Sequence, residues 1–291
     1  MPSFFINQES KKAIIDLYYK KLQSLNLDFE FLTVETSFGD TNIIATGSIN
    51  NPPLILMHSE NSCAPIAIEK LKALEEKFRI YAIDILGQPN LSEEVRLNPK
   101  TDDYGKWMYE ILSRLQIYKT YFVGISLGGF IGLKSLIYNQ NRIFQAFLIH
   151  PAGIVNGNRF EVFVKAYLPS TSFKIRKKTT CLKQFMKNTY TNEDAFALKF
   201  LSKLFLTYRT KWLSIPLMTT QEAQIITIPL NIIAAKDDYL FPGEKLLNRA
   251  QKLFPSLKKT LLLENSKHVP SKDDYDRIKE LILETLITSK K

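Results

Sequence analysis

Short, continuous apolar runs alternate along this chain with longer segments whose apolar residues recur every three or four positions. The first pattern is typical of strands covered on both faces, and the second is typical of amphipathic helices. The strand-like runs lie at 28–39, 41–48, 53–58, 79–86, 120–125, 144–150, 230–236 and 260–266. This alternation predicts an α/β fold with a mostly parallel eight-stranded sheet and helices on both faces.

The helix-like segments fall between these runs and at the two ends of the chain. Helices are expected over 7–26, from Pro65, from Thr101, and over 128–139 and 242–254. Ser271 with Asp274 resembles a capping box that starts a last helix. The first two strand-like runs are separated by Gly39-Asp40, which predicts a hairpin there.

The alternation breaks once, between His150 and Pro229, where no segment resembles a strand. Ala195, Leu198, Leu201, Leu204 and Phe205 instead fall on one face of a helix. An all-helical block inside an α/β chain predicts a cap inserted over the sheet, with its aromatic and leucine stripes mostly in the core. The predicted division is residues 1–151 for the first part of the α/β core, 152–216 for the helical cap and 217–291 for the second part.

Composition places the 291 residues among ordinary globular proteins, with 45% apolar and 23% charged residues. The apolar run between Lys119 and Lys134 is too short to span a bilayer, and the N-terminus lacks the pattern of a signal peptide. Cys63 and Cys181 lie far apart and belong to no metal-ligand spacing. A cytoplasmic protein without metal or cofactor is therefore expected.

The stretch YFVGISLGGF, residues 121–130, carries the strongest functional signal. A strand, the turn G-x-S-x-G and a helix form a nucleophile elbow, which presents a serine at the carboxyl end of a strand. Side chains at Gly124 and Gly128 would collide with neighbouring backbone in so tight a turn. Ser126 is therefore the expected nucleophile, at a helix N-terminus that favours developing negative charge.

A serine nucleophile needs a histidine base and an acid that orients it. Of the three histidines, His268 follows the last strand on a loop that can turn back toward the sheet. The preceding strand ends at Asp237-Asp238, which completes the order serine, acid, histidine. His58 is expected to brace a loop, and His150 is either pocket-lining or a buried structural histidine. Asp84 is expected to be structural.

Seven segments of the chain resemble the α/β-hydrolase fold family, specifically its bacterial carboxylesterase-like members, over nearly the whole length. These are PLILMHSE, YAIDILGQPNLSE, DDYGKWMYEIL, YFVGISLGGF, HPAGI, AAKDDYLFPGE and NSKHVPS. The resemblance implies that Asp238, rather than Asp237, is the acid. It also implies that the backbone amides of Leu127 and Glu60 form the oxyanion hole. Ser59 stands where the family usually has glycine.

The expected function is hydrolysis of small carboxylic esters through an acyl-enzyme formed on Ser126. The same three residues serve thioesters, lactones, amides and meta-cleavage diketones, so these remain alternatives. A ligand-binding pseudo-hydrolase is the alternative outside catalysis. The sequence does not set the natural substrate, its acyl length or the oligomeric state.

Nearly all of the net charge of +10 lies in the predicted cap. Residues 162–215 contain only two acidic residues, Glu193 and Asp194. The basic residues there are Lys165, Lys174, Arg176, Lys177, Lys178, Lys183, Lys187, Lys199, Lys203, Arg209 and Lys211. A solvated lysine-rich surface is the favoured interpretation. Steering of anionic substrates toward the pocket and docking on an anionic membrane are the functional alternatives. Nucleic acid is not expected as a partner, since no recognised binding motif accompanies the charge.

Overall fold

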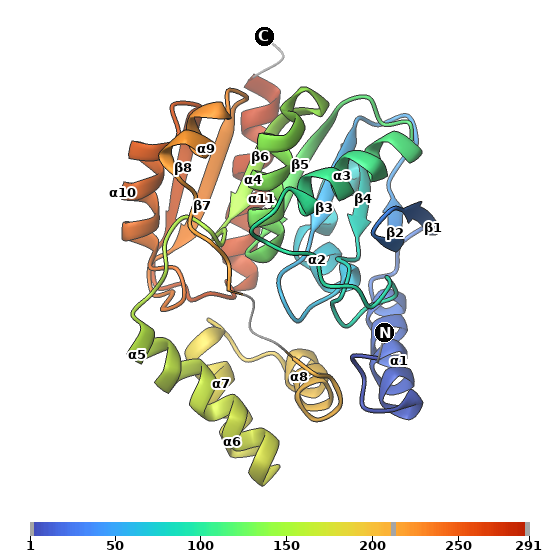
Figure 1. Cartoon of the computed structure of the whole chain (residues 1–291), viewed down its shortest axis with the longest axis vertical. Coiled ribbons are helices and arrows are strands. Elements are labelled where there is room, and N and C mark those ends of the chain that lie inside the picture. Colours follow the sequence, from blue (N-terminus) through green and yellow to red (C-terminus); the bar gives the residue numbers. More distant parts are fainter. Residues whose placement is uncertain (1–2, 211–213, 289–291) are drawn as a thin grey trace.

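One sheet of eight strands runs through the part of the computed structural model that is described, residues 3–210 and 214–288 (Figure 1). Its strand order is β1-β2-β4-β3-β5-β6-β7-β8. The strands are β1 (Phe29–Thr36), β2 (Gly39–Thr46), β3 (Pro53–Met57), β4 (Arg79–Ile83), β5 (Thr120–Ile125), β6 (Ile143–Ile149), β7 (Leu230–Ala235) and β8 (Leu257–Leu263). β2 pairs antiparallel with β1 and β4, and the other pairs are parallel. The predicted fold class is confirmed.

The turn of the first hairpin lies two residues before the predicted position. Thr36 pairs with Gly39, so Ser37 and Phe38 form the turn and Gly39 already belongs to β2. Gly39 has a φ of +130°. This conformation strongly favours glycine, which explains why the sequence signal falls beside the turn rather than in it.

Helices cover both faces of the sheet and bury their apolar sides against it. One face carries α1 (Gln8–Ser24), α2 (Ala64–Leu71) and α11 (Lys272–Thr288). The other carries α3 (Asp103–Arg114), α4 (Leu127–Asn139), α9 (Thr220–Ile225) and α10 (Gly243–Leu253). Short 3₁₀ turns follow α2 (Lys72–Glu76) and α4 (Gln140–Arg142). In the described residues no helix is both long and apolar enough to cross a membrane.

The predicted capping box at the last helix is present. The Ser271 hydroxyl accepts from the Asp274 amide at 3.1 Å, and the Asp274 carboxylate accepts from the Ser271 amide at 3.2 Å. These two bonds satisfy amides that α11 itself cannot satisfy.

A helical insertion, residues 159–207, lies between β6 and β7 at one end of the sheet (Figure 1). It begins with a continuous helical run made of α5 (Arg159–Val162), a π-helical turn (Phe163–Tyr167) and α6 (Leu168–Arg176). Next come α7 (Thr179–Thr189) and α8 (Ala195–Thr207). α8 packs against α1, and its buried residues join the core on the α1 side.

Two expectations about the insertion need correction. Ala195 is exposed because it opens α8, whose buried face is Ala197, Phe200, Leu201, Leu204 and Phe205. The prediction that the apolar stripes of the insertion are mostly core holds for α7 and α8, but the first helical run carries an apolar stripe that faces solvent. Lys211, one of the basic residues counted above, lies outside the described residues.

Candidate active site

Ser126 lies on the turn between β5 and α4, in a backbone conformation that few residues adopt. Its φ is 53° and its ψ is −108°, and its side chain is nearly buried. The Ser126 amide donates to the Ile149 carbonyl at 2.9 Å, and the Ser126 carbonyl accepts from the Ala152 amide at 3.1 Å. These contacts from the end of β6 hold a strained turn in place, as is common at functional sites.

The two glycines of the motif are required by close backbone approach. A Cβ on Gly124 would lie 2.4 Å from the Gly128 carbonyl oxygen, and one on Gly128 would lie 2.5 Å from the Met57 carbonyl oxygen. Both obstacles are backbone atoms, which a small side-chain shift cannot clear. The steric argument made from the sequence therefore holds for both positions.

His268 and Asp238 meet as a buried hydrogen-bonded pair. The His268 Nδ1 lies 2.7 Å from the Asp238 Oδ2, while the other carboxylate oxygen accepts from the amides of Leu240 and Phe241 at 2.7 and 3.1 Å. Burial alone would raise the pKa of Asp238, but His268 and the Phe241 amide together hold it below its usual value. Asp238 thus stays ionised, and Asp237 is exposed beside it.

The loop that carries His268 is held by the link between α7 and α8. The Val269 amide donates to the Thr189 carbonyl at 2.9 Å, and the Thr191 amide donates to the Val269 carbonyl at 2.9 Å. The Tyr239 hydroxyl, next to Asp238, lies 3.0 Å from the Thr189 hydroxyl. The insertion therefore helps to position the histidine. Sequence reasoning missed these residues, because nothing local to 189–191 indicates a pairing with 269.

The loop after β3 contains Ser59 and Glu60, and His58 fixes its path. The buried His58 ring contacts the Ser59 carbonyl through Nδ1 at 2.7 Å, and its Nε2 accepts from the Ile85 amide at 3.0 Å. Burial lowers the pKa of His58 to about 4, so the ring is neutral and Nδ1 carries the proton. The Ser59 carbonyl and the Glu60 amide belong to one planar peptide unit. His58 therefore sets the direction of the Glu60 N–H, as well as bracing the loop as predicted.

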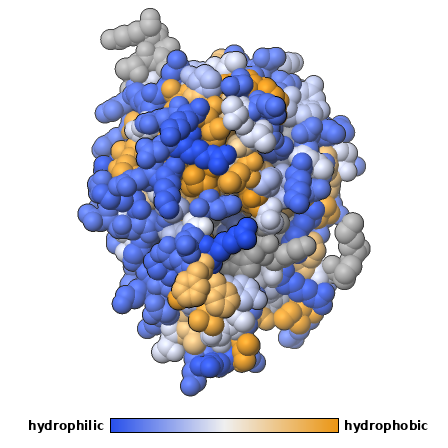
Figure 2. Space-filling model, turned by 60° about the vertical axis from the view of Figure 1, so that its left-hand side comes forward, coloured by the Kyte–Doolittle hydropathy of each residue, from blue (hydrophilic) through white to orange (hydrophobic). Residues whose placement is uncertain are grey.

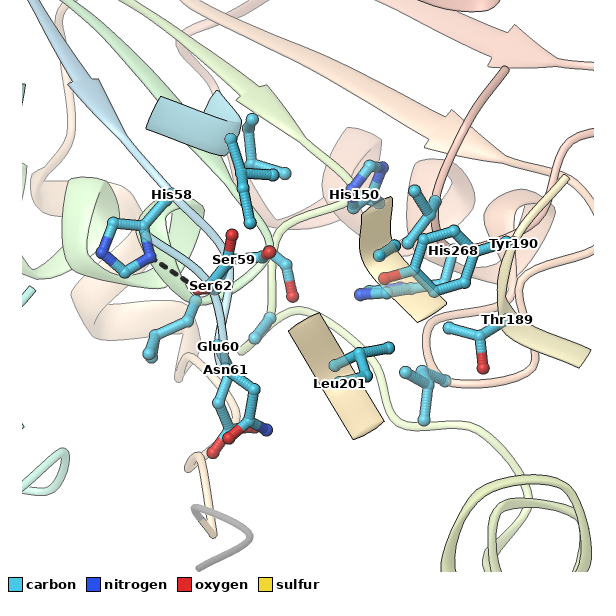
Figure 3. Close-up of a pocket in the computed structure, with 18 of the residues that line it drawn as sticks. His58, Ser59, Glu60, Asn61, Ser62, His150, Thr189, Tyr190, Leu201 and His268 are labelled. Carbon is cyan, nitrogen blue, oxygen red and sulfur yellow. Dashed lines mark hydrogen bonds between the residues drawn. The ribbon is translucent and has the colours of Figure 1, made fainter. Parts of the chain in front are cut away.

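His150 lies beside His268, with ring centroids 4.9 Å apart (Figure 3). It is 1% exposed and has a φ of 35°. Burial, and then the proximity of His268, lower the pKa of His150 to about 3. Within the described residues, its Nδ1 has no hydrogen-bond partner. His150 thus lines the pocket and is not a fully satisfied core histidine, which decides between the two alternatives left open by the sequence.

Ser126 and His268 line the same cavity, which has a volume of about 430 Å³. Leu127, Ser59 and Glu60 also line it. Figure 3 shows the 58–62 loop on one side and His150 and His268 on the other, next to Thr189, Tyr190 and Leu201 of the insertion. The insertion contributes a continuous part of the apolar wall: Phe185, Phe196, Ala197, Phe200, Leu201 and Phe205. The cavity therefore combines a polar end with an apolar body.

Asp84 is separate from this cavity and serves the fold. It is fully buried, and its carboxylate accepts from the Ala64 amide at 2.8 Å, from the Tyr18 hydroxyl at 2.9 Å and from the Asn42 amide group at 2.9 Å. It thus joins α1, β2 and the start of α2, in agreement with the structural role predicted. In the described ranges, no group of three His, Cys, Asp or Glu side chains is arranged to hold a metal ion.

Comparison of the sequence with known proteins identifies the family to which the chain belongs. The sequence profile of the alpha/beta hydrolase fold matches residues 52–275. The chain belongs to the α/β-hydrolase fold family. Carboxylesterase YbfK of Bacillus subtilis (strain 168) is 24% identical to this α/β-hydrolase over 297 residues, which covers 97% of this chain and 96% of the relative. An uncharacterised carboxylesterase of the same strain is 22% identical over 271 residues, which covers 86% of this chain and 84% of the relative.

Solved structures agree on the fold of this α/β-hydrolase. Naproxen esterase (carboxylesterase NP) from Bacillus subtilis superposes with a TM-score of 0.85 at 20% identity, covering 98% of this chain and 100% of that one. Carboxylesterase CesB (YbfK) from Bacillus subtilis gives 0.82 at 22% identity, covering 96% and 98%. The resemblance to carboxylesterase-like members of the family is confirmed.

Proposed function

We propose that this α/β-hydrolase is a serine carboxylesterase that acts on small, largely apolar esters. The observation that carries the proposal is one cavity that contains both Ser126, on its strained turn, and His268, bonded to a buried, ionised Asp238. The carboxylesterases among its relatives, matched over nearly their full length, support the ester as substrate class.

In this mechanism the Ser126 hydroxyl attacks the ester carbonyl carbon while His268 takes its proton. Asp238 keeps the proton of His268 on Nδ1, so that the other nitrogen is free to accept, and stabilises the imidazolium that forms. His268 then gives this proton to the leaving alcohol, and the acyl group remains bonded to Ser126. In the second half of the reaction water attacks the acyl-enzyme while His268 takes a proton from it. His268 then gives that proton to the Ser126 oxygen as the carboxylic acid leaves.

The tetrahedral oxyanion would accept hydrogen bonds from the amides of Leu127 and Glu60. Leu127 is the first residue of α4, so its amide has no acceptor within the helix. The direction of the Glu60 amide is set by the His58 contact to Ser59. We also propose that the insertion acts as the cap, within the division 1–151, 152–216 and 217–291, since it supplies part of the apolar wall that would hold the acyl group.

A fluorophosphonate probe tests the nucleophile directly, because it phosphonylates an activated serine. We expect labelling of wild type at Ser126, no labelling of Ser126→Ala, and loss of turnover of p-nitrophenyl esters in that variant. A folded wild-type protein that binds small apolar esters without labelling would favour the pseudo-hydrolase. Labelling without ester turnover would indicate an active nucleophile with a different substrate class, namely thioesters, lactones, amides or diketones.

A further inference from the structure

The first helical run of the insertion, 159–176, exposes a row of large apolar side chains to solvent. The row comprises Phe160, Phe163, Val164, Tyr167, Leu168 and Ile175, with exposed fractions from 41% to 76%. Most of these residues are three or four positions apart, so they share one face of the helix. Figure 2, which brings this side of the molecule forward, shows apolar residues gathered on the lower part of the surface with hydrophilic residues around them. We call this row the outer face.

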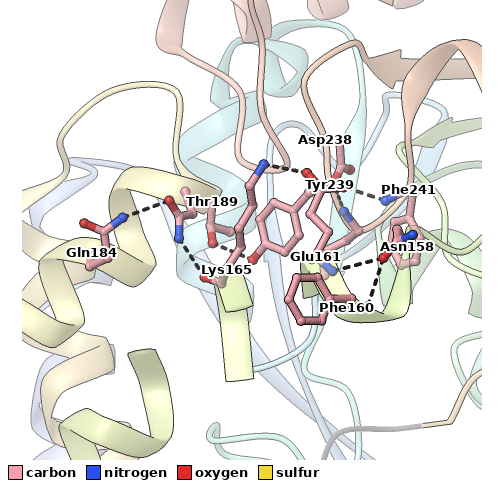
Figure 4. Close-up of polar contacts among 11 residues, drawn as sticks. Asn158, Phe160, Glu161, Lys165, Gln184, Thr189, Asp238, Tyr239 and Phe241 are labelled. Atoms are coloured by element: carbon pink, nitrogen blue, oxygen red, sulfur yellow. Dashed lines mark hydrogen bonds and ion pairs between the residues drawn. The ribbon is translucent and has the colours of Figure 1, made fainter. Parts of the chain in front are cut away.

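The opposite face of the same helix is fixed to the protein, so the exposure of the outer face is built into the fold. Ala166 and Phe173 are buried in the core cluster that includes α7 and α8. The Asn158 side chain caps the first turn by accepting from the amides of Phe160 and Glu161 at 2.9 and 3.1 Å (Figure 4). The Asn188 side chain of α7 donates to the Lys165 carbonyl at 2.9 Å. These contacts fix the rotation of the helix about its own axis, so that the outer face points to solvent.

The charge around the outer face is predominantly positive, since Glu161, which pairs with Lys165, is the one acidic residue in the helical run 159–176. Between Glu161 and Glu193 the sequence has no acidic residue and seven basic ones. Arg176, Lys177 and Lys178 follow one another at the end of the helix, and all three are exposed. An apolar stripe bordered by lysine and arginine is the pattern of helices that lie in the interface of anionic membranes.

We propose that the outer face docks this protein on an anionic lipid surface, with the six apolar side chains entering the headgroup boundary and the basic cluster contacting lipid phosphates and carboxylates. A second copy of the chain fits less well, because a symmetric contact through this face would bring two sets of uncompensated positive charges together. The charge pattern by itself favoured a solvated lysine-rich surface over membrane docking.

The row of exposed aromatic and aliphatic side chains reverses this order, because a purely solvated surface does not require it.

Docking in this way would place the candidate active site beside the lipid. Arg159 and Val162, in the first turn of the same helix, line the cavity. Esters that partition into membranes would then reach Ser126 from the docked face, a consequence that rests on the proposed function. The docking itself does not rest on it, and the experiment therefore measures binding separately from catalysis.

The experiment uses Ser126→Ala protein and flotation with vesicles of phosphatidylcholine, either alone or with about one-third phosphatidylserine. The first test variant, Phe160→Ser/Phe163→Ser, has Ile49→Ser/Tyr118→Ser as its control, since Ile49 and Tyr118 are exposed apolar residues elsewhere. The second, Arg176→Gln/Lys177→Gln/Lys178→Gln, is matched by Lys245→Gln/Lys252→Gln/Lys258→Gln, which removes three exposed lysines from other surfaces. Melting temperatures of all variants establish that each is folded.

We expect binding to the anionic vesicles only, decreasing as salt rises because the charges are screened. The charge variant should bind on the order of 100-fold more weakly, at roughly fivefold for each charge removed. The aromatic variant should lose at least about tenfold, because two buried apolar side chains are removed. Both controls should bind like the parent. Absence of vesicle binding, or equal losses in the controls, would overturn the proposal. So would a concentration-dependent dimer abolished by the same variants, which would assign the face to a second copy of this chain.

Discussion

Replacing Asp238 by asparagine tests the proposed mechanism at its most specific point. In the wild type one carboxylate oxygen accepts from two backbone amides at 2.7 and 3.1 Å, and the other faces the His268 Nδ1 at 2.7 Å. The side-chain carbonyl oxygen of the introduced asparagine would remain at the amides, because its NH₂ group cannot accept from them. That leaves the NH₂ group facing Nδ1. His268 must then carry its proton on Nε2, the nitrogen needed to accept the proton of Ser126.

The expected cost is a fall in kcat of about 10⁴, because the histidine is held in the wrong tautomer although its position is unchanged. This corresponds to about 5 kcal/mol of transition-state stabilisation. Steady-state hydrolysis of a p-nitrophenyl ester measures it, with the melting temperature as a check on folding. Asp237→Asn is the matched control, and since Asp237 is exposed its kcat should stay within about twofold of wild type. A loss below about tenfold for Asp238→Asn, or a larger loss for Asp237→Asn, would refute the reasoning.

Three further predictions follow from the loop after β3 and from the buried titratable groups. Ser59→Gly should preserve or raise ester turnover, because the substitution removes bulk beside the proposed oxyanion site; a large loss would show that the hydroxyl contributes. His58→Phe should lower kcat by about 10² or more with little change in KM, since the Glu60 amide loses the contact that orients it; an unchanged kcat in a folded variant would show that His58 does not orient a catalytic donor. The free energy of unfolding should fall as pH drops from about 6 to about 5, by about 1.4 kcal/mol per pH unit, as measured by urea unfolding. The pKa values of His58 and His150 lie at about 4 and 3 in the folded protein, so the unfolded chain binds up to two more protons there. Burial raises the pKa of Asp84 to about 6, so the folded protein binds one proton that the unfolded chain lacks, which offsets half of the loss. A free energy of unfolding that stays constant or rises as pH drops through this interval would contradict the protonation states given for His58, His150 and Asp84.

Features encoded within a few consecutive residues could be predicted from the sequence. The elbow at Ser126 is one of them, because strand, turn and helix all fall within residues 121–130 and the glycine requirement is a local steric one. The sheet was predictable for a related reason. Buried parallel strands need continuous apolar runs, and each run is visible without knowledge of its neighbours. The turn at Ser37-Phe38 was misplaced because the glycine signal belongs to a residue beside the turn.

Tertiary structure decided what depends on residues distant in the chain. Asp237 and Asp238 are adjacent and chemically identical. The family resemblance implied Asp238, and the fold shows that this residue is the one buried against His268. The support of the His268 loop by Thr189 and Thr191, and the aim of the Glu60 peptide by His58, are likewise contacts without a local sequence signal. The outer face of 159–176 shows the same limit. A helical period establishes that an apolar stripe exists, but whether protein, solvent or another surface covers it depends on how the whole helix is placed.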